Sequence, residues 1–215
     1  MASSVGVTEQ VYQNLLRMVM QNDVDPGSRM VIDKIALDLG VSSTPVREAL
    51  ARLETQGLVY KERLRGYFAS EMISSAEFDD LWEFRLLVEP YAARHAALRL
   101  GGTGRVRLRE ELDSIRSVRL ADDYPSKRAV REHDQRLHDL VMELAGNKHA
   151  RKAIAQTHAH NRMLRVHFAA LDGYRAVQEH AEVVEALNSA DPDAAEETMR
   201  RHIENAYTRL RGYLA

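Results

Sequence analysis

Residues 41–70 read VSSTPVREALARLETQGLVYKERLRGYFAS, which combines a helix pattern with two short strand patterns. Ser42 and Ser43 can cap the helix through their hydroxyls. Proline is tolerated in the first turn of a helix but not in its interior, so Pro45 places the helix start at Ser43 or Thr44. The apolar residues that follow have the 3.6-residue spacing of a helix with one buried face: Val46, Ala49, Leu50 and Leu53.

The sequence on both sides of this helix predicts a winged helix-turn-helix domain. A shorter helix pattern ends at Gly40, one tight turn earlier, and Gly57 ends the longer helix. The apolar and aromatic segments at 58–60 and 67–69 then predict the two strands of a hairpin, the wing.

The residues upstream predict the rest of this domain. We expect residues 1–7 to be disordered, and Thr8 with Glu9 to open a helix that supports the longer helix from behind. A short strand at 30–32 is expected to lie against the wing, and Asp33 can cap the helix that follows it.

Such a domain can bind double-stranded DNA, because an α-helix fits the major groove. An arginine in the first turns can make paired hydrogen bonds to guanine, and hydroxyl groups can hold phosphates or base edges. Cations on the wing can add phosphate contacts. The predicted DNA-binding residues are Ser42, Ser43, Thr44, Arg47, Arg52, Lys61, Arg63 and Arg65.

A small helical module with a solvated, charged hairpin is the alternative interpretation of the same residues. The net charge does not discriminate between the two, because residues 1–70 hold eight Lys and Arg against eight Asp and Glu. The cations gather on the wing and the acids on the first two helices, so the prediction of DNA binding rests on local placement.

The composition excludes several other classes of protein. No apolar run approaches the ~20 residues that a membrane helix needs, and the N-terminus has no signal-peptide pattern, so we expect a cytoplasmic protein. The chain has no cysteine, which excludes disulfides, thiolate metal sites and cysteine nucleophiles. A metal in this chain therefore has to be held by histidine and carboxylate.

The sequence beyond the wing predicts a second, all-helical domain. We place the boundary near residue 72, which gives domains at 1–72 and 73–215 and a mainly α fold class. Glycine and proline punctuation divides the second domain into an antiparallel bundle of six helices. Their expected ranges are 75–99, 104–121, 126–145, 147–170, 173–189 and 192–213.

Four polar residues lie on the apolar faces of three of these helices: Asp134, His138, His180 and His202. A single inward histidine is more often a hydrogen-bonded core residue than a metal ligand. Four inward polar groups would cost on the order of 1–3 kcal/mol each if they were left without partners. One divalent transition metal, with zinc or nickel as the candidates, satisfies all four.

The other histidines are weaker candidates for this site. His158 and His160 face different directions, and we expect His158 to be the inward one. The simplest expectation for the remaining four, His95, His133, His149 and His167, is a position at the surface or at a helix end.

The first domain resembles the DNA-binding domain of the GntR family of bacterial transcription regulators. The resemblance rests on VSSTPVREAL at 41–50, RLETQGLV at 52–59 and RG at 65–66. This chain has Ser43 where relatives often carry an arginine that touches the operator. The resemblance therefore supports DNA binding more than it supports a particular operator sequence.

The second domain resembles the FCD ligand-binding domain of the FadR-like branch of this family. In that branch Asp-x-x-x-His on one helix and a histidine from each of two later helices bind a metal. The matching residues here are Asp134, His138, His180 and His202. By the same resemblance Arg85 and Arg162 are the candidates to bind a small acid at the metal, and His158 and Asn205 are further candidates for this pocket. Either arginine could instead be a core-edge residue paired with Glu89 or another acid.

These features together predict a homodimeric transcription factor that a small carboxylate effector controls. The effector would bind at the metal and alter the affinity of the two DNA-binding domains for a palindromic operator. Two alternatives remain open at this point. The metal site could activate water in a hydrolase, or the metal could be purely structural in a protein that binds DNA constitutively.

Overall fold

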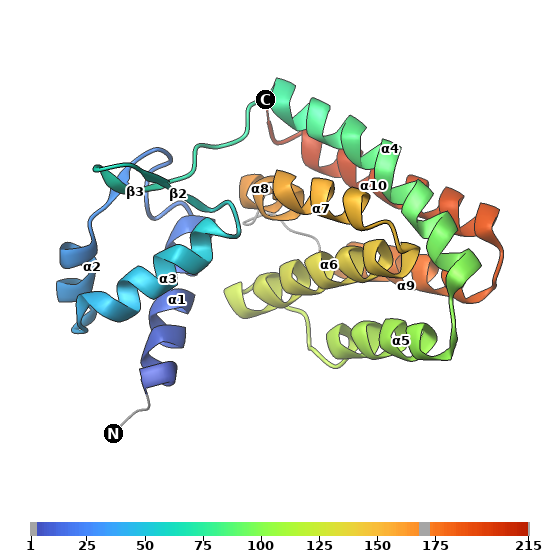
Figure 1. The fold of residues 1–215 in the computed structure, drawn as a ribbon, viewed down its shortest axis with the longest axis horizontal. Helices are drawn as coiled ribbons and strands as arrows, with labels where there is room; N and C mark the ends of the chain where they lie inside the picture. Colours follow the sequence, from blue (N-terminus) through green and yellow to red (C-terminus); the bar gives the residue numbers. More distant parts are fainter. Residues whose placement is uncertain (1–3, 168–172, 215) are drawn as a thin grey trace. The chain divides into compact units, whose positions relative to one another are not determined.

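The computed structural model describes residues 4–167 and 173–214, and the chain separates into two compact units, residues 1–72 and 73–215. Most of the chain is helical, and the strands occur in the first unit (Figure 1). The expected fold class, a winged helix-turn-helix followed by an all-helical domain, is confirmed.

The first unit contains a helix-turn-helix and a three-stranded antiparallel sheet. The strands have the order β1-β3-β2, with Tyr60 opposite Phe68 in the β2–β3 hairpin. Gly40 adopts the left-handed backbone conformation (φ 65°), which turns the chain sharply between α2 and α3. The elements are α1 (Ser4–Met20), β1 (Arg29–Met30), α2 (Ile32–Leu39), α3 (Ser43–Glu54), β2 (Val59–Glu62) and β3 (Gly66–Ala69).

Helix α3 packs its apolar face against α1, and this packing forms the core of the first unit. Leu50 and Leu53 of α3 are fully buried, as are Leu15 and Leu16 of α1. Each such leucine contributes roughly 1.5–3 kcal/mol through removal from water. The predicted inward stripe of α3 is therefore confirmed.

Two expectations for the start of the chain are wrong. Helix α1 begins at Ser4 rather than at Thr8, so only the first three of the seven residues expected to be disordered precede the helix. Asp33 does not cap α2: Val31 is the N-cap, and Asp33 lies in the first turn. A carboxylate in the first turn still interacts favourably with the positive end of the helix dipole.

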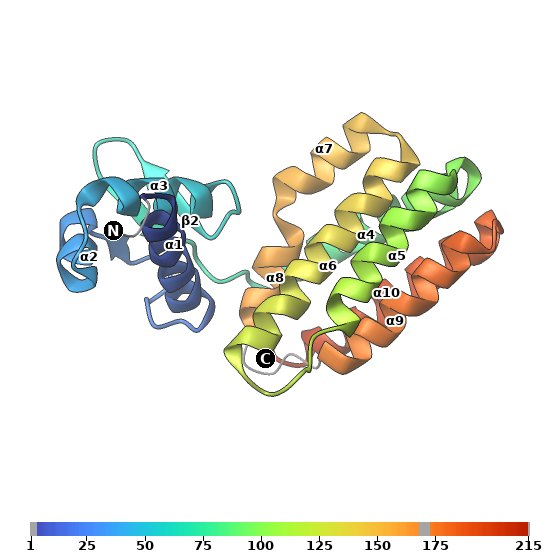
Figure 2. The same ribbon diagram turned by 90° about the horizontal axis from the view of Figure 1, so that it is seen from below.

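The second unit is a helical bundle in which α4 packs against α10 and α6 (Figures 1 and 2). Helices α4 and α10 run antiparallel: Ser75 donates a hydrogen bond to the Leu214 carbonyl at one end, and Arg94 pairs with Asp193 at the other. The helices are α4 (Ser75–Arg99), α5 (Gly102–Arg116), α6 (Tyr124–Ala145), α7 (Lys148–Thr157), α8 (Ala159–His167), α9 (Gly173–Asn188) and α10 (Pro192–Arg211).

The predicted single helix at 147–170 is wrong, because the chain breaks at His158. His158 has φ 51°, in the left-handed region, and it ends α7 immediately before α8 begins. Residues 168–170 of that prediction lie outside the described residues. Helix α5 also ends at Arg116 rather than at 121, and Asp123 accepts a hydrogen bond from the Ser126 amide to cap the next helix.

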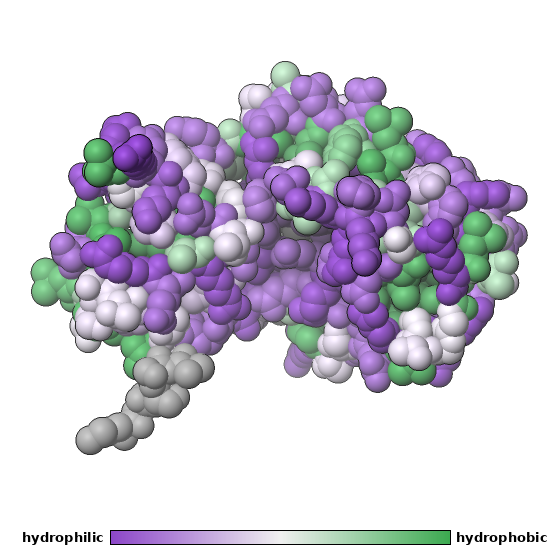
Figure 3. Space-filling view, in the orientation of Figure 1, coloured by the Kyte–Doolittle hydropathy of each residue, from purple (hydrophilic) through white to green (hydrophobic). Residues whose placement is uncertain are grey.

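Hydrophilic residues cover much of the face seen in Figure 3, with apolar residues scattered among them. Within 4–167 and 173–214, no helix combines the length and the apolar character that crossing a membrane requires.

Candidate DNA-binding surface and metal site

Helix α3 exposes the residues that were predicted to read DNA. Ser42, Thr44 and Arg47 are exposed, while Ser43 is half-buried at the helix start. Ser42 is the N-cap residue, but its hydroxyl makes no capping bond to the described backbone, so it is available to an external partner. Among the described residues Arg47 has no hydrogen-bond or ion-pair partner. Its guanidinium is therefore also available to an external partner.

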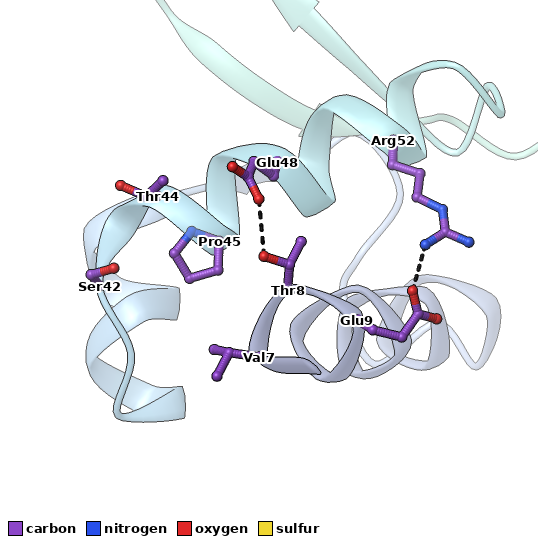
Figure 4. Close-up of a pocket in the computed structure, with 8 residues that line it drawn as sticks. All are labelled: Val7, Thr8, Glu9, Ser42, Thr44, Pro45, Glu48 and Arg52. Atoms are coloured by element: carbon purple, nitrogen blue, oxygen red, sulfur yellow. Dashed lines mark hydrogen bonds and ion pairs between the residues drawn. The ribbon is translucent and has the colours of Figure 1, made fainter. Parts of the chain in front are cut away.

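A surface hollow of about 670 Å³ lies between α1 and α3 (Figure 4). Thr8 donates a hydrogen bond across it to Glu48 (2.9 Å), and Arg52 binds Glu9 of α1 (2.7 Å). The Arg52 guanidinium also stacks 3.6 Å from the centre of the Tyr12 ring. Arg52 is therefore held against α1, which the prediction of a DNA contact did not anticipate.

The wing presents its three cations to solvent. Lys61 lies 5.5 Å from the centre of the Tyr67 ring, and Arg65 pairs with Glu62. Arg63 is exposed at the tip, next to Leu64, which is 98% exposed and has φ 65°. The hairpin thus carries cations in the positions expected of a wing.

The structure brings together the four polar residues that the sequence placed on inward helix faces. Asp134 and His138 come from α6, His180 from α9 and His202 from α10, and each offers one ligand atom within 4.8 Å of the others. The Nε2 atoms of His138 and His202 are 3.2 Å apart. Oδ1 of Asp134 lies 3.8 Å from Nε2 of His138 and 3.5 Å from Nε2 of His180.

Three of these four residues have a hydrogen-bond partner on the side away from the others. Nδ1 of His138 contacts Glu89, and Nδ1 of His202 contacts Glu179 at 3.0 Å. Oδ2 of Asp134 accepts from Nδ1 of His160 at 2.8 Å. Outer partners of this kind fix the orientation of metal ligands.

The protonation states suit a divalent metal. Burial lowers the pKa of His138 to about 3 and that of His202 to about 4, so both imidazoles are neutral near pH 7. Burial alone would raise the pKa of Asp134, but His160 and the neighbouring histidines hold it well below its usual range. These three residues are therefore two neutral imidazoles and an anionic carboxylate, which are the forms that bind Zn²⁺ or Ni²⁺.

His180 provides the direct test of whether a metal fits. Both of its ring nitrogens are buried, and neither has a hydrogen-bond partner among the described residues. A buried polar atom without a partner costs about 1–3 kcal/mol. A cation between His180 and Asp134 removes that cost on the Nε2 side, so the residues fit a metal.

The structure corrects the expectation for the histidines of α7 and α8. His160, rather than His158, faces Asp134, because the left-handed backbone at His158 rotates α8 relative to α7. His158 is half-buried at the break. His133, expected at the surface, is fully buried and contacts Glu111 through Nδ1 at 2.8 Å.

The residues expected to bind an effector acid are engaged within the protein. Arg85 is 5% exposed and bonds Glu89 at 2.5 Å, which is the core pairing that the sequence offered as the alternative to anion binding. Arg162 binds Glu77 at the start of α4, and neither it nor His158 bonds to the four-residue cluster in the described structure. Asn205 donates to Glu179 at 3.3 Å.

Three contacts of the cluster were not predicted from the sequence: Glu89 with His138, Glu179 with His202, and His160 with Asp134. The first two had signals in the sequence: Glu89 lies one turn from Arg85 on a buried face, and Glu179 directly precedes His180. His160 had none, because the bend at His158 is not visible in the helix pattern.

Family models match both parts of the chain. The model of the bacterial regulatory proteins of the gntR family matches residues 7–68, and the FCD domain model matches residues 80–205, more than half of the chain. A winged helix-turn-helix domain followed by an all-helical FCD domain is the architecture of a bacterial transcription regulator. The chain belongs to the GntR family, in the branch with an FCD domain, and it is a DNA-binding transcriptional regulator with an effector-binding domain.

Individual relatives agree with this assignment over nearly the whole chain. The repressor RspR of Escherichia coli is 26% identical, with 92% of this chain and 86% of RspR covered. The regulator YdhC of Bacillus subtilis, itself uncharacterized, is 21% identical, with 95% and 91% covered. These relatives give no support to the hydrolase alternative.

Solved structures share the fold. McbR/YncC of E. coli superposes with a TM-score of 0.68 at 19% identity, and 98% of each chain is covered. A GntR regulator from Rhodococcus sp. RHA1 gives a TM-score of 0.64 at 22% identity, with 95% of this chain and 97% of that chain covered.

Proposed function

We propose that the FCD domain holds a divalent transition metal, zinc or nickel, and that a small organic acid binding at this metal controls the affinity of the protein for its operator. The proposed ligands are Asp134, His138, His180 and His202. Metal bound there would supply a Lewis-acidic centre to which a carboxylate can bind through an open coordination position.

The convergence of three imidazoles and a carboxylate in one buried space is the observation that carries this proposal. Nε2 of His138 and Nε2 of His202 face each other at 3.2 Å, and His180 has two buried nitrogens without partners among the described residues. Asp134 adds an ionised carboxylate to the same space. A divalent cation in this space would coordinate the imidazoles and the carboxylate together.

The proposed DNA contacts come from α3 and from the wing. Arg47 is the candidate for direct base recognition, because it is exposed and unpaired within the described chain. Ser42, Ser43 and Thr44 are candidates for phosphate or base-edge contacts, and Lys61, Arg63 and Arg65 for phosphate contacts. Arg52 is removed from this set because Glu9 and Tyr12 already hold it.

We also propose that the protein acts as a homodimer in the cytoplasm. Helix-turn-helix regulators recognise palindromic half-sites through the two-fold symmetry of the protein, and a regulator has to reach the chromosome. An effector acts on such a dimer only if its affinity differs between the DNA-binding and the released arrangement.

A purely structural metal is the remaining competitor. It predicts that the metal raises the melting temperature and that no small acid alters DNA binding. Enzymatic turnover is not part of the proposal, because the named relatives are transcriptional regulators.

The test is a DNA-binding titration with protein that is metal-free, metal-loaded, or metal-loaded with a panel of mono- and dicarboxylic acids. The DNA is a duplex selected by the protein from a random pool. The proposal expects an affinity change of fivefold or more, in the range typical of allosteric coupling, with at least one acid and only in the metal-loaded form. If the loaded protein binds DNA identically with every acid, the structural role is favoured.

A further inference from the structure

We infer that Glu89 and Glu179 are positioning residues of the metal site, each fixing one histidine in the tautomer that directs Nε2 to the metal. This inference rests on the proposed function, since it concerns how the proposed ligands are oriented. Glu89 acts on His138 and Glu179 acts on His202.

The first positioning group is a chain of three buried residues, Arg85, Glu89 and His138. The side chains of Arg85 and Glu89 are 5% and 2% exposed, and Nε of Arg85 donates to Oε1 of Glu89 at 2.5 Å. The other carboxylate oxygen, Oε2, bonds to Nδ1 of His138. Arg85 is a permanent cation that contacts both oxygens of Glu89, so it pairs with the carboxylate in its anionic, hydrogen-bond-accepting form.

The second positioning group repeats this arrangement with Arg209, Glu179 and His202. Arg209 donates two hydrogen bonds to the carboxylate of Glu179, at 2.5 and 2.8 Å, and Nδ1 of His202 bonds to its Oε2 at 3.0 Å. The helices differ: Glu89 lies on α4 and Glu179 on α9. Two unrelated segments of the bundle thus provide the same three-residue arrangement.

The chemistry of the carboxylate determines the tautomer. An ionised carboxylate only accepts hydrogen bonds, so the imidazole nitrogen that faces it has to carry the proton. A neutral imidazole has one proton, and its other nitrogen then presents a lone pair. His138 and His202 therefore both direct Nε2 lone pairs at each other across 3.2 Å, which is the orientation that a shared metal needs.

This arrangement also assigns a role to Arg85. Its guanidinium balances the negative charge of the Glu89 carboxylate and so favours the ionised form of Glu89. In this role Arg85 does not bind the effector. A carboxylate ligand would have to compete for Arg85 with a buried carboxylate one turn away on the same helix. We therefore place Arg85 with the positioning residues.

The test compares Glu89→Gln and Glu179→Gln with the unsubstituted protein in titrations of the metal-free protein with Co²⁺ and Zn²⁺. Glutamine keeps the size of the side chain but loses the charge, so it no longer imposes the Nδ1–H tautomer. We expect each variant to bind metal 10- to 100-fold more weakly, as for other outer partners of metal ligands, and to change the visible absorption of bound Co²⁺.

Asp79→Asn is the matched control. Asp79 binds Arg211 through two hydrogen bonds at 2.7 and 3.1 Å, as Glu179 binds Arg209, but it contacts no histidine of the cluster. Its metal affinity and Co²⁺ spectrum should equal those of the unsubstituted protein. Equal affinity and an equal spectrum in both glutamine variants would overturn the inference while leaving the metal site in place.

The histidine tautomers can also be measured directly in the unsubstituted protein, which does not depend on the folding of any variant. Long-range ¹⁵N NMR of labelled histidines in the metal-free and Zn²⁺-loaded protein reports which ring nitrogen carries the proton. We expect Nδ1–H for His138 and His202 in both states. An Nε2–H tautomer at either one in the metal-free protein would contradict the inference for that residue, and a protein that binds neither metal would overturn the proposed function together with it.

Discussion

Nε2 of His138 lies 3.2 Å from Nε2 of His202, although the two residues come from different helices and each has its other ring nitrogen bonded to a buried glutamate. If both imidazoles carry their proton on Nδ1, as inferred above, the two Nε2 atoms are both acceptors. The contact becomes favourable when a cation occupies the space between them and Asp134, which makes metal dependence the first property to measure.

His180→Ala should lower both the metal content and the melting temperature. The substitution removes one of four ligands, and a bound metal stabilises a fold by about 2.7 kcal/mol when its free concentration is 100 times the dissociation constant. Elemental analysis and thermal melting measure the two effects. His149→Ala, at an exposed position near the start of α7, is the control and should change neither. A full metal complement in His180→Ala would contradict the ligand assignment.

Arg47→Ala should weaken binding to the selected duplex by about 1–3 kcal/mol if Arg47 pairs with a base. The fold should be unchanged, because the side chain is exposed and bonds to no described residue. Arg17→Ala, also exposed in the first unit, serves as the comparison in the same fluorescence-anisotropy titration. Equal affinities for Arg47→Ala and the unsubstituted protein would remove Arg47 from the DNA-binding surface.

Arg52→Ala should affect stability more than DNA binding. It removes an ion pair with Glu9 and a cation–π contact with Tyr12, which at exposed positions contribute roughly 0.2–1 and 0.5–1 kcal/mol. Thermal melting should therefore show a small decrease, with Arg63→Ala unchanged as the comparison. A large loss of DNA affinity with no change in melting would restore Arg52 to the DNA-binding set.

The metal-stripped protein should lose stability as the pH falls from about 6.5 toward 4. Burial lowers the pKa of His138 to about 3 and that of His202 to about 4, below the ordinary value of 6.5. In that window the unfolded chain binds more protons than the folded one, so acidification favours unfolding. Melting temperatures measured from pH 7.5 to 4 test this, and a melting temperature that stays constant or rises on acidification would contradict it.

The parts of the fold that follow from local periodicity could be predicted from the sequence. The apolar spacing of residues 46–53 identified the buried face of α3, and the same spacing placed Asp134 and His138 on an inward face of α6. His180 and His202 followed in the same way. The helical periodicity shows on which face of its helix each of the four side chains lies. The side chains converge because the helices that carry them pack together.

The features that the sequence did not predict depend on tertiary contacts. The left-handed backbone at His158 has no signal in the helix pattern, so His160 was assigned the wrong face. For Arg85 the sequence left two interpretations open, pairing with Glu89 and binding of an effector, because periodicity alone does not show whether a guanidinium is already bound by an acid of its own chain. Arg52 was assigned to DNA because its partners, Glu9 and Tyr12, lie some forty residues earlier in the chain.

The left-handed residue His158 interrupts the helix between α7 and α8, so the direction of His160 is not set by the helical phase of α7. In an uninterrupted helix, inserting or deleting one residue before His160 would swing its imidazole by about 100° around the helix axis. Because α8 begins as a separate helix after His158, the backbone at His158 can adjust when the length of α7 changes. We therefore expect the contact of His160 with Asp134 to tolerate a one-residue change in the length of α7.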